Sequence, residues 1–278
     1  MRISEITQSN LRADIKDIMS SPFHHASLRG GSCFTLKRIH AQVDQIQYDD
    51  FESETDYIFR TPDQLLSHRR GVCYDIVSYT AQLFNLRGIP YRLYFAYAGL
   101  PVSDNRTHTF LVFRYKKSWY WFESSWRQHS GISGPFSNIR KLLHRAGSLL
   151  IESGWENYRI REYRLFDGAG MNLNQYGQRI VDQLPIGLRL DSSNIHMTGV
   201  FVENFIPNGA NLGVAFYRIH NTGDADVDIH RTVLGRYVNH SVQPNVRLVN
   251  RSGTYSYSAI VPIRSGTEIL VDYNQFPW

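Results

Sequence analysis

The chain has 278 residues, of which 42% are hydrophobic and 20% charged, and its formal net charge is +5. Typical domains hold roughly 100 to 150 residues, so this length favours two domains, and the composition excludes a disordered, collagen-like or low-complexity chain. The mild charge excludes a specific nucleic-acid partner, and the lack of an apolar run near the ~20 residues of a membrane span predicts a soluble, cytoplasmic protein without membrane partners.

The first two thirds of the chain predict an α/β arrangement. A polar and partly helical lead to about residue 55 precedes a short helix, which Thr61 can cap and Pro62 can begin. Small and apolar residues at helical spacing then predict a helix that starts at Cys73 and ends near Gly88. Extended, aromatic-rich runs follow at 90–99, 108–115 and 118–126, then a helix at 138–151 and a strand at 156–166.

The last third predicts a different kind of domain. Residues 167–185 mix Gly, Asn and Gln with little apolar content and are expected to link two domains. From residue 186 onward, short strands alternate with turns rich in Gly, Asn and Pro. We therefore expect an α+β domain at 1–166, with its core at about 55–130, a linker at 167–185 and a mainly β domain at 186–278.

Cys73, His108 and Glu123 form a candidate thiol site. The first turn of a helix favours negative charge, because its unpaired amides and the helix dipole attract an anion, so a thiolate at Cys73 would be stabilised there. A two-residue connection at Lys116 and Lys117 would place His108 and Glu123 on one face of a hairpin, in diagonal contact range. A three-residue connection would place them on opposite faces.

This order of residues resembles the transglutaminase-like superfamily of papain-like cysteine enzymes. The motifs that carry the resemblance are RRGVCYDIV at 69–77, THTFLVF at 107–113 and WYWFESSW at 119–126. The resemblance implies that Cys73 is the nucleophile, that His108 is the general base and acid, and that Glu123 orients the imidazole. Many members carry Asp in the third role, so Glu123 is a modest departure. The substrate implied is a glutamine side chain or a peptide.

Each of these residues also has an ordinary structural interpretation. Cys73 could be a small buried hydrophobic residue, His108 a polar strand end and Glu123 a salt-bridge partner. Their joint spacing favours the thiol site, whereas Cys33 lacks such neighbours and is expected to be structural. Asp75, two residues after Cys73, is expected on the surface.

A second set of motifs lies in the predicted β domain. The blocks SNIHMTGVFVENFIPNGANLG at 193–213, HRTVLGRYVNHSVQPNVRL at 230–248 and YSAIVPIRSGTEILVDYNQF at 257–276 resemble the SET domain of protein lysine methyltransferases. The resemblance covers about 192–278 and implies a compact β fold with a knot-like core. It also implies S-adenosylmethionine as the cofactor and a protein with a lysine side chain as the substrate.

The same resemblance assigns roles to individual residues. It implies an active-site tyrosine at Tyr273, with Asp272 beside it. The residues it places against the cofactor are Gly199, Val200, Phe201, Arg236, Tyr237, Asn239 and His240. Methyl transfer to an amine is an in-line displacement that depends on alignment, and aromatic side chains can line the lysine channel. The candidates for that channel are Tyr255, Tyr257 and Phe276.

Two positions depart from the family pattern. Met197 stands where the first motif usually has Gly, which could crowd the cofactor and puts activity in doubt more than fold. Val242 stands where many relatives have a zinc-binding Cys, so we expect no zinc. His24 and His25 lack partners at metal-ligand spacing, and no other metal site is expected.

Three functions follow as alternatives. The first combines a lysine methyltransferase with a cysteine hydrolase or acyltransferase in one chain. The second is mainly a cysteine peptidase, deamidase or acyltransferase with a degenerate SET domain. The third is a non-catalytic interaction protein that reuses both folds, because a fold does not fix a function. The motif combination suggests a bacterial or phage source, with the host cytoplasm as the location if the source is viral.

Overall fold

The computed structural model describes residues 31–49 and 56–277, with the side chains of all of these except residues 31–34 and 104. The chain divides into two compact units, each described here by itself. The N-terminal unit contains the described residues up to Ala98 together with Arg106–Tyr176. The C-terminal unit contains Gly99–Asn105 and the described residues from Gly177 onward. Among the described residues, no helix has the length and hydropathy that crossing a bilayer requires.

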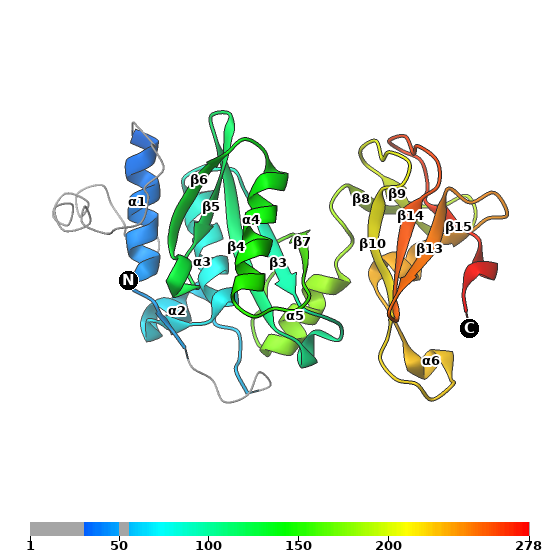
Figure 1. Cartoon of the computed structure of the whole chain (residues 1–278), viewed down its shortest axis with the longest axis horizontal. Coiled ribbons are helices and arrows are strands. Elements are labelled where there is room, and N and C mark those ends of the chain that lie inside the picture. Colours follow the sequence, from blue (N-terminus) through cyan, green and yellow to red (C-terminus); the bar gives the residue numbers. More distant parts are fainter. Residues whose placement is uncertain (1–30, 50–55, 278) are drawn as a thin grey trace. The chain divides into compact units, whose positions relative to one another are not determined.

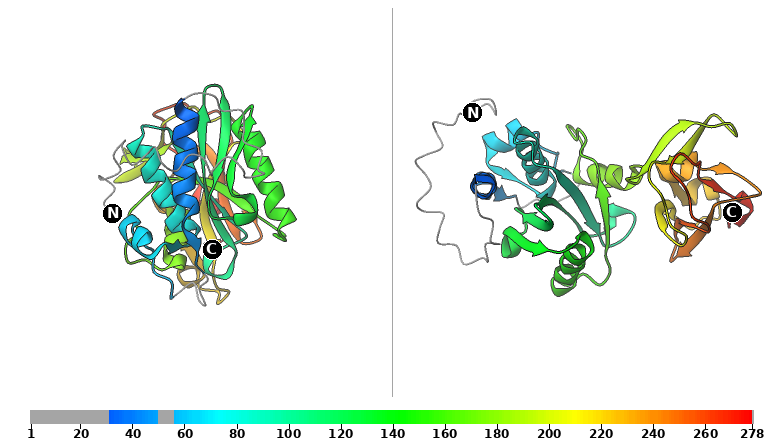
Figure 2. Two further views of the ribbon diagram at one scale, coloured as in Figure 1. Left: turned by 90° about the vertical axis from the view of Figure 1, so that its left-hand side faces the viewer. Right: turned by 90° about the horizontal axis from the view of Figure 1, so that it is seen from above.

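The N-terminal unit is built on a five-stranded antiparallel sheet in the order β6-β5-β4-β3-β7 (Figure 1). Helices α1 and α3 lie on one face of this sheet and α4 lies on the other (Figure 2, left). The elements are α1 (Gly31–Asp44), β1 (Gln47–Tyr48), α2 (Pro62–His68), β2 (Arg70–Gly71), α3 (Cys73–Leu86), β3 (Tyr91–Tyr97), β4 (Thr107–Tyr115), β5 (Ser118–Glu123), β6 (Gly131–Phe136), α4 (Ile139–Glu152) and β7 (Arg159–Tyr163).

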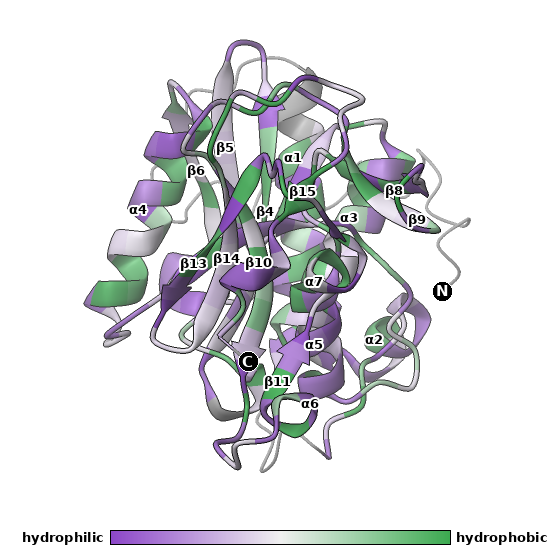
Figure 3. Cartoon of the chain, turned by 90° about the vertical axis from the view of Figure 1, so that its right-hand side faces the viewer, coloured by the Kyte–Doolittle hydropathy of each residue, from purple (hydrophilic) through white to green (hydrophobic). Residues whose placement is uncertain are grey.

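The sheet is hydrophobic on both faces because helices cover both. Helix α4 turns Leu142, Ala146 and Leu149 toward Phe110 and Trp121 of the sheet, where they form one buried cluster. Its ribbon alternates between hydrophobic and hydrophilic segments, as expected of a helix with one buried face (Figure 3).

The hairpin of β4 and β5 has the register that the sequence predicts. Tyr115 pairs with Ser118, so Lys116 and Lys117 form a two-residue connection, and Lys116 has a φ of 55°. Left-handed backbone is usual in such tight hairpin turns. The prediction of a two-residue connection is therefore confirmed. With this register, residues 108 and 123 lie on the same face of the hairpin.

The C-terminal unit contains a six-stranded sheet in the order β11-β10-β14-β13-β15-β12 and a separate two-stranded sheet. Its core includes Val200, Phe216, Leu234 and Tyr257. Its elements are β8 (Leu188–Ser192), β9 (Thr198–Val202), β10 (Asn211–Arg218), α6 (Ala225–Asp228), β11 (Ile229–Arg231), α7 (Val233–Tyr237), β12 (Asn239–His240), β13 (Val246–Arg251), β14 (Thr254–Ala259) and β15 (Leu270–Val271).

Part of the segment predicted as a linker is helical. Helix α5 (Leu173–Asp182) buries Leu173, Tyr176, Ile180 and Val181. These apolar residues recur at helical spacing but are hidden among Asn, Gln and Gly, whose composition suggested a loop. The division between the two units falls inside this helix, after Tyr176.

Candidate active sites

His108 and Glu123 are hydrogen-bonded in the N-terminal unit. The His108 Nε2 atom lies 3.0 Å from Glu123 Oε2, and the two side chains are 12% and 1% exposed. His108 also interacts electrostatically with Cys73, a free and buried cysteine at the first position of α3. Because Glu123 engages Nε2, Nδ1 is the nitrogen left to exchange a proton with the thiol. The three predicted residues thus form one connected chain of side chains.

Glu123 is held in place by the turn that follows it. Its Oε1 atom accepts hydrogen bonds from the backbone amides of Ser124 at 2.9 Å, Ser125 at 2.9 Å and Trp126 at 3.0 Å. The Ser125 hydroxyl adds a fourth at 3.1 Å. One carboxylate oxygen is therefore fixed by the backbone while the other faces His108. This arrangement supplies a physical reason why Glu fits a position at which many relatives have Asp.

The electrostatics of the pair favour an imidazolium next to a carboxylate. Burial alone would lower the pKa of His108, but the Glu123 charge and the contacts with Cys73 outweigh it and raise that pKa to about 10. Burial alone would raise the pKa of Glu123, but His108 and the amides of Trp126 and Ser125 lower it below its ordinary value. His108 is therefore protonated at neutral pH.

These shifts predict a pH-dependent stability that Glu123→Gln removes. The raised pKa of His108 stabilises the fold fully below the ordinary value of 6.5, and this contribution is lost as pH rises toward about 10. The lowered pKa of Glu123 stabilises it above the ordinary 4.5, and this is lost as pH falls through the lowered value. The melting temperatures of wild type and Glu123→Gln should be compared from pH 3 to pH 10. Their difference should be largest at pH values above the lowered pKa of Glu123 and below the raised pKa of His108. Parallel curves at every pH would contradict the assignment.

Asp75 is buried, which corrects the expectation that it lies on the surface. Only 1% of the residue is exposed, and its carboxylate accepts hydrogen bonds from the Tyr57 hydroxyl at 2.5 Å, the Arg60 amide at 2.8 Å and the Val72 amide at 2.9 Å. The prediction considered only the position of Asp75 on the helix. In the structure, Tyr57 and Arg60 contact Asp75 and cover that face of α3. Asp75 thus fixes the first turn of α3, which carries Cys73.

Tyr48 is a member of the site that the sequence did not predict. Strand β1 pairs in parallel with β2, which places Tyr48 opposite Gly71, two residues before Cys73. Burial and the neighbouring Cys73 raise the pKa of Tyr48 far above its ordinary value, so the two side chains interact. The surrounding sequence, QIQYDD, carries no pattern that would single out this tyrosine.

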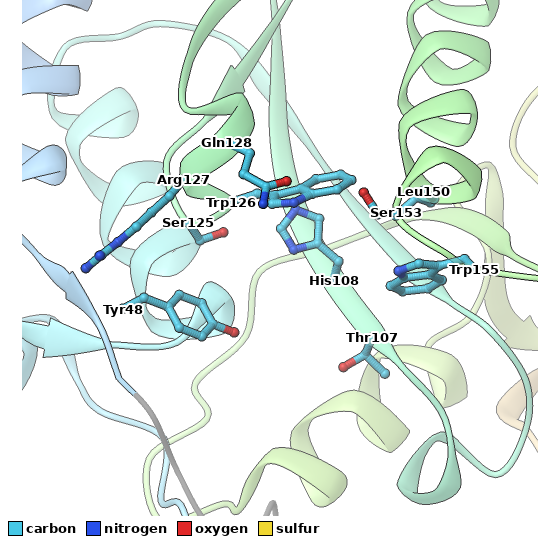
Figure 4. A pocket seen from close by; sticks show the side chains of 10 residues that line it. All are labelled: Tyr48, Thr107, His108, Ser125, Trp126, Arg127, Gln128, Leu150, Ser153 and Trp155. Carbon is cyan, nitrogen blue, oxygen red and sulfur yellow. The ribbon is translucent and has the colours of Figure 1, made fainter.

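A cavity of about 430 Å³ opens beside these residues. Figure 4 shows the His108 ring and the Tyr48 hydroxyl directed into it, with indole rings from Trp126 and Trp155 along its walls. Its lining residues are Tyr48, Thr107, His108, Ser125, Trp126, Arg127, Gln128, Leu150, Ser153 and Trp155. None of these carries a carboxylate, so the cavity suits an uncharged or anionic acyl group.

The three predicted blocks of the C-terminal unit lie side by side. Strand β12 pairs in parallel with β15, which sets Asn239 opposite Leu270 and His240 opposite Val271. The first block joins the third through the amide of Ile269, which donates to the carbonyl of Val200 at 2.7 Å. Segments up to about 75 residues apart in the sequence therefore form one local structure.

Asn239 connects all three blocks through its side chain. The residue is 7% exposed, and its Nδ2 atom donates to Glu268 Oε1 at 2.8 Å and to the carbonyls of His196 and Thr198, each at 3.3 Å. A Cβ atom on Gly199 would collide with the Glu268 carboxylate. Glycine at 199 therefore allows the first and third blocks to approach this closely.

Tyr273 lies at the edge of an aromatic cluster. Its hydroxyl donates to the Val238 carbonyl at 2.9 Å, and its ring lies 5.1 Å from both His240 and Phe276. Burial raises the pKa of Tyr273, which keeps the hydroxyl protonated. Tyr257 is fully buried, and its hydroxyl has no hydrogen-bond partner among the described residues. An unpaired buried hydroxyl is costly unless a ligand pairs with it.

The remaining predicted residues are more dispersed. Val200 points into the core, and Phe201 lies under the guanidinium of Arg189, with 5.5 Å from the ring centre to Cζ. Arg236 and Tyr237 are exposed on α7. Tyr255 lines a separate hollow with Arg218 and Asn250.

The two departures from the family pattern both lie at the surface. Met197 has a φ of 40°, in the left-handed region that favours glycine, and is 80% exposed. Its conformation is thus the one that the usual glycine would adopt, at a strain of about 1–2 kcal/mol. Val242 is 83% exposed. Within residues 31–49 and 56–277, no group of three or more His, Cys, Asp or Glu residues is arranged to hold a metal.

Together, the tyrosine, the asparagine and the aligned blocks define a unit with the motifs of a methyltransferase. The family model described as the SET domain matches residues 35–274, so the chain belongs to the SET domain family. SET domain methyltransferases use S-adenosylmethionine and act on protein lysine. The match spans residues of both units. The comparisons give no evidence of the transglutaminase-like domain that the sequence predicted for the N-terminal unit.

Solved structures similar to this chain include three methyltransferases. A candidate histone methyltransferase of Plasmodium falciparum is 17% identical, with a TM-score of 0.28, and the match covers 33% of this chain and 96% of that one. The methyltransferase domain of human PR domain-containing protein 2 is 19% identical, with a TM-score of 0.28 and coverages of 36% and 86%. Chaetomium thermophilum Polycomb Repressive Complex 2 bound to S-adenosylmethionine is 17% identical, with a TM-score of 0.27 and coverages of 40% and 17%. A search of curated proteins gives no match.

Proposed function

We propose that the chain transfers methyl groups from S-adenosylmethionine to lysine side chains of a protein substrate through its C-terminal unit. The observation that carries this proposal is the ring contact between His240 and Tyr273, which come from different blocks, beside Asn239, whose side chain joins the three blocks. The unpartnered Tyr257 hydroxyl supports it, because a substrate nitrogen or a ligand oxygen would supply the missing hydrogen bond.

The residues present fit the cofactor and the substrate. Asn239 and Glu268 hold the first and third blocks together, and Gly199 and His240 would contact S-adenosylmethionine. When bound, the cofactor supplies the sulfonium methyl group. The Tyr273 hydroxyl donates a hydrogen bond to the Val238 carbonyl, which leaves the hydroxyl oxygen as an acceptor for an N–H of the incoming lysine. Such a contact orients a neutral amine for in-line attack.

Methyl transfer is tested directly with labelled cofactor. Full-length protein is incubated with methyl-labelled S-adenosylmethionine and a panel of lysine-rich proteins, and the products are mapped by mass spectrometry. The proposal expects label on lysine side chains. Labelling of no protein, by a chain that does bind the cofactor, would favour a degenerate SET domain instead.

We propose a second activity for the N-terminal unit, as a cysteine hydrolase or acyltransferase of the transglutaminase-like type. The specific observation is the hydrogen bond between His108 and Glu123 at the edge of a cavity, together with the interaction of His108 with Cys73. His108 holds the proton of the Cys73 thiol before the reaction, and the Cys73 sulfur forms a bond to the acyl carbon. His108 then protonates the leaving group as its bond to carbon breaks. Water, or an amine acceptor, releases the acyl group and restores the thiol.

The lining of the cavity indicates the acyl donor. Trp126 and Trp155 offer flat apolar walls, while Gln128 and Thr107 offer neutral hydrogen-bonding groups. A glutamine side chain or a peptide bond meets these requirements, and either is a possible substrate. A thiol-directed probe followed by peptide mapping provides the test. Preferential labelling of Cys73 over Cys33 supports the activity, and equal labelling favours a non-catalytic protein that reuses both folds.

A further inference from the structure

A second, smaller cavity of about 250 Å³ lies next to the cavity of the thiol site. Tyr48, Ser125 and Arg127 line both cavities, so the two share part of their walls. The other lining residues of the second cavity include Asp44, the last residue of α1, and Ile76 of α3. Asp44 and Arg127 take no part in the proposed thiol reaction, so this cavity requires a separate explanation.

The second cavity carries two opposite charges that are not paired with each other. Among the described residues, the Asp44 carboxylate and the Arg127 guanidinium are the only charged groups that line it. Within residues 31–49 and 56–277, neither side chain forms an ion pair. Figure 4 shows the Arg127 side chain directed away from His108. A ligand with a single charge would leave one of these two groups without a partner, so the lining favours a molecule that carries both charges.

The rest of the lining combines hydroxyl groups with an apolar wall. The Ser130 hydroxyl donates to Asp44 Oδ1 at 3.5 Å, a long contact that leaves Oδ2 without a hydrogen bond among the described residues. The Ser124 hydroxyl is buried and has no hydrogen-bond partner in the same part of the chain. Ile46 and Ile76, which are 7% and 1% exposed, supply the apolar surface. The ligand is therefore expected to be polar at one end and aliphatic at the other.

The size of the cavity limits the ligand to a small molecule. Liquid water occupies about 30 Å³ per molecule, so 250 Å³ corresponds to about eight waters. Valine has a similar number of non-hydrogen atoms, carries both charges on one carbon and has a branched aliphatic side chain. A peptide of several residues would not fit within this volume.

We propose that the second cavity binds a free α-amino acid with a small aliphatic side chain, such as valine. The Arg127 guanidinium donates to the carboxylate of the ligand, a group that its planar fork of N–H donors matches. The Asp44 carboxylate accepts from the ammonium group, and Ile46 and Ile76 contact the side chain. This binding site does not depend on the proposed thiol activity, because it uses neither Cys73 nor His108.

The requirement for both charges is tested by calorimetry with three ligands of matched shape. Valine, isobutylamine, which lacks the carboxylate, and isovalerate, which lacks the amino group, are each titrated into full-length protein at neutral pH. We expect one valine per chain, with affinities at least about tenfold weaker for the other two, since each loses a hydrogen bond between charged groups. If isobutylamine or isovalerate binds as tightly as valine, the cavity recognises one charge only and the inference is overturned.

Variants of the two charged residues locate the bound valine. Arg127→Gln and Asp44→Asn should each weaken valine binding at least about tenfold. Arg114→Gln is the matched control, because Arg114 is an exposed residue of β4 that lines neither cavity. Cys73→Ala should bind valine as the wild type does, which separates this site from the thiol chemistry. No valine binding by the wild type, or equal binding by Arg127→Gln and Arg114→Gln, would overturn the inference and leave the proposed thiol activity intact.

Discussion

His108→Ala should slow acylation of Cys73 by p-nitrophenyl acetate by about 10²- to 10⁴-fold, the range that a positioned general base contributes. In the wild type the imidazole already holds the thiol proton and, as imidazolium, is paired with Glu123 at 3.0 Å. Alanine removes the acceptor and leaves the carboxylate buried without its partner. The measurement is the burst rate of p-nitrophenol release by full-length protein.

His144→Ala provides the control, because His144 is an exposed residue of α4 outside the cavity. Its burst rate should match the wild type. Added imidazole should restore part of the rate of His108→Ala, since a small base can occupy the vacated space. A burst rate in His108→Ala equal to that of the wild type would show that Cys73 reacts as an ordinary thiol, which would refute the proposed thiol activity.

Tyr273→Phe should lower the rate of methyl transfer by about 10²-fold, similar to the loss of one aligned polar contact in a transition state. The Tyr273 hydroxyl is oriented by Val238 at 2.9 Å, and phenylalanine would leave both the carbonyl and the lysine nitrogen without this partner. The ring contact with Phe276 would persist, so the fold should be retained. The measurement is transfer of labelled methyl from S-adenosylmethionine to the best protein substrate.

Tyr273→Phe should lower the rate of methyl transfer more than it lowers the affinity for S-adenosylmethionine. Tyr217→Phe serves as a comparison, because Tyr217 stacks on His230 elsewhere in the same unit. That variant should keep the wild-type rate. If Tyr273→Phe transfers methyl groups as fast as Tyr217→Phe, the lysine nitrogen is oriented by another group, and Tyr257 becomes the first candidate.

Local periodicity accounts for the parts of the structure that the sequence predicts well. Side chains alternate along strands, so a two-residue connection was enough to place residues 108 and 123 on one face. The helix start at Cys73 and the register of β4 and β5 follow from such short-range rules. Motif order likewise indicated that residues near 199, 239 and 273 belong to one site.

Contacts between distant segments account for what the sequence missed. Tyr48 reaches Cys73 only because β1 pairs with β2, and no pattern in a two-residue strand announces this pairing. Asp75 is buried because residues 57–60 cover it. Tyr255 and Tyr257 lie two positions apart on β14. Tyr255 borders a hollow with Arg218 and Asn250, whereas Tyr257 packs against Phe216, which also contacts Phe276. The alternation of side chains along a strand predicts which face of the sheet a residue lies on. It does not predict which residue of that face lies nearest to the site.

The most direct test of the central claim is titration of S-adenosylmethionine into full-length protein by calorimetry, with Asn239→Ala and Cys73→Ala as variants. Wild type and Cys73→Ala should bind one cofactor per chain with equal affinity. Asn239→Ala should bind at least about tenfold more weakly, a loss of ~1.4 kcal/mol, because the bonds to Glu268 and the first block are gone. No binding by the wild type, or equal binding by Asn239→Ala, would contradict the proposed methyltransferase site.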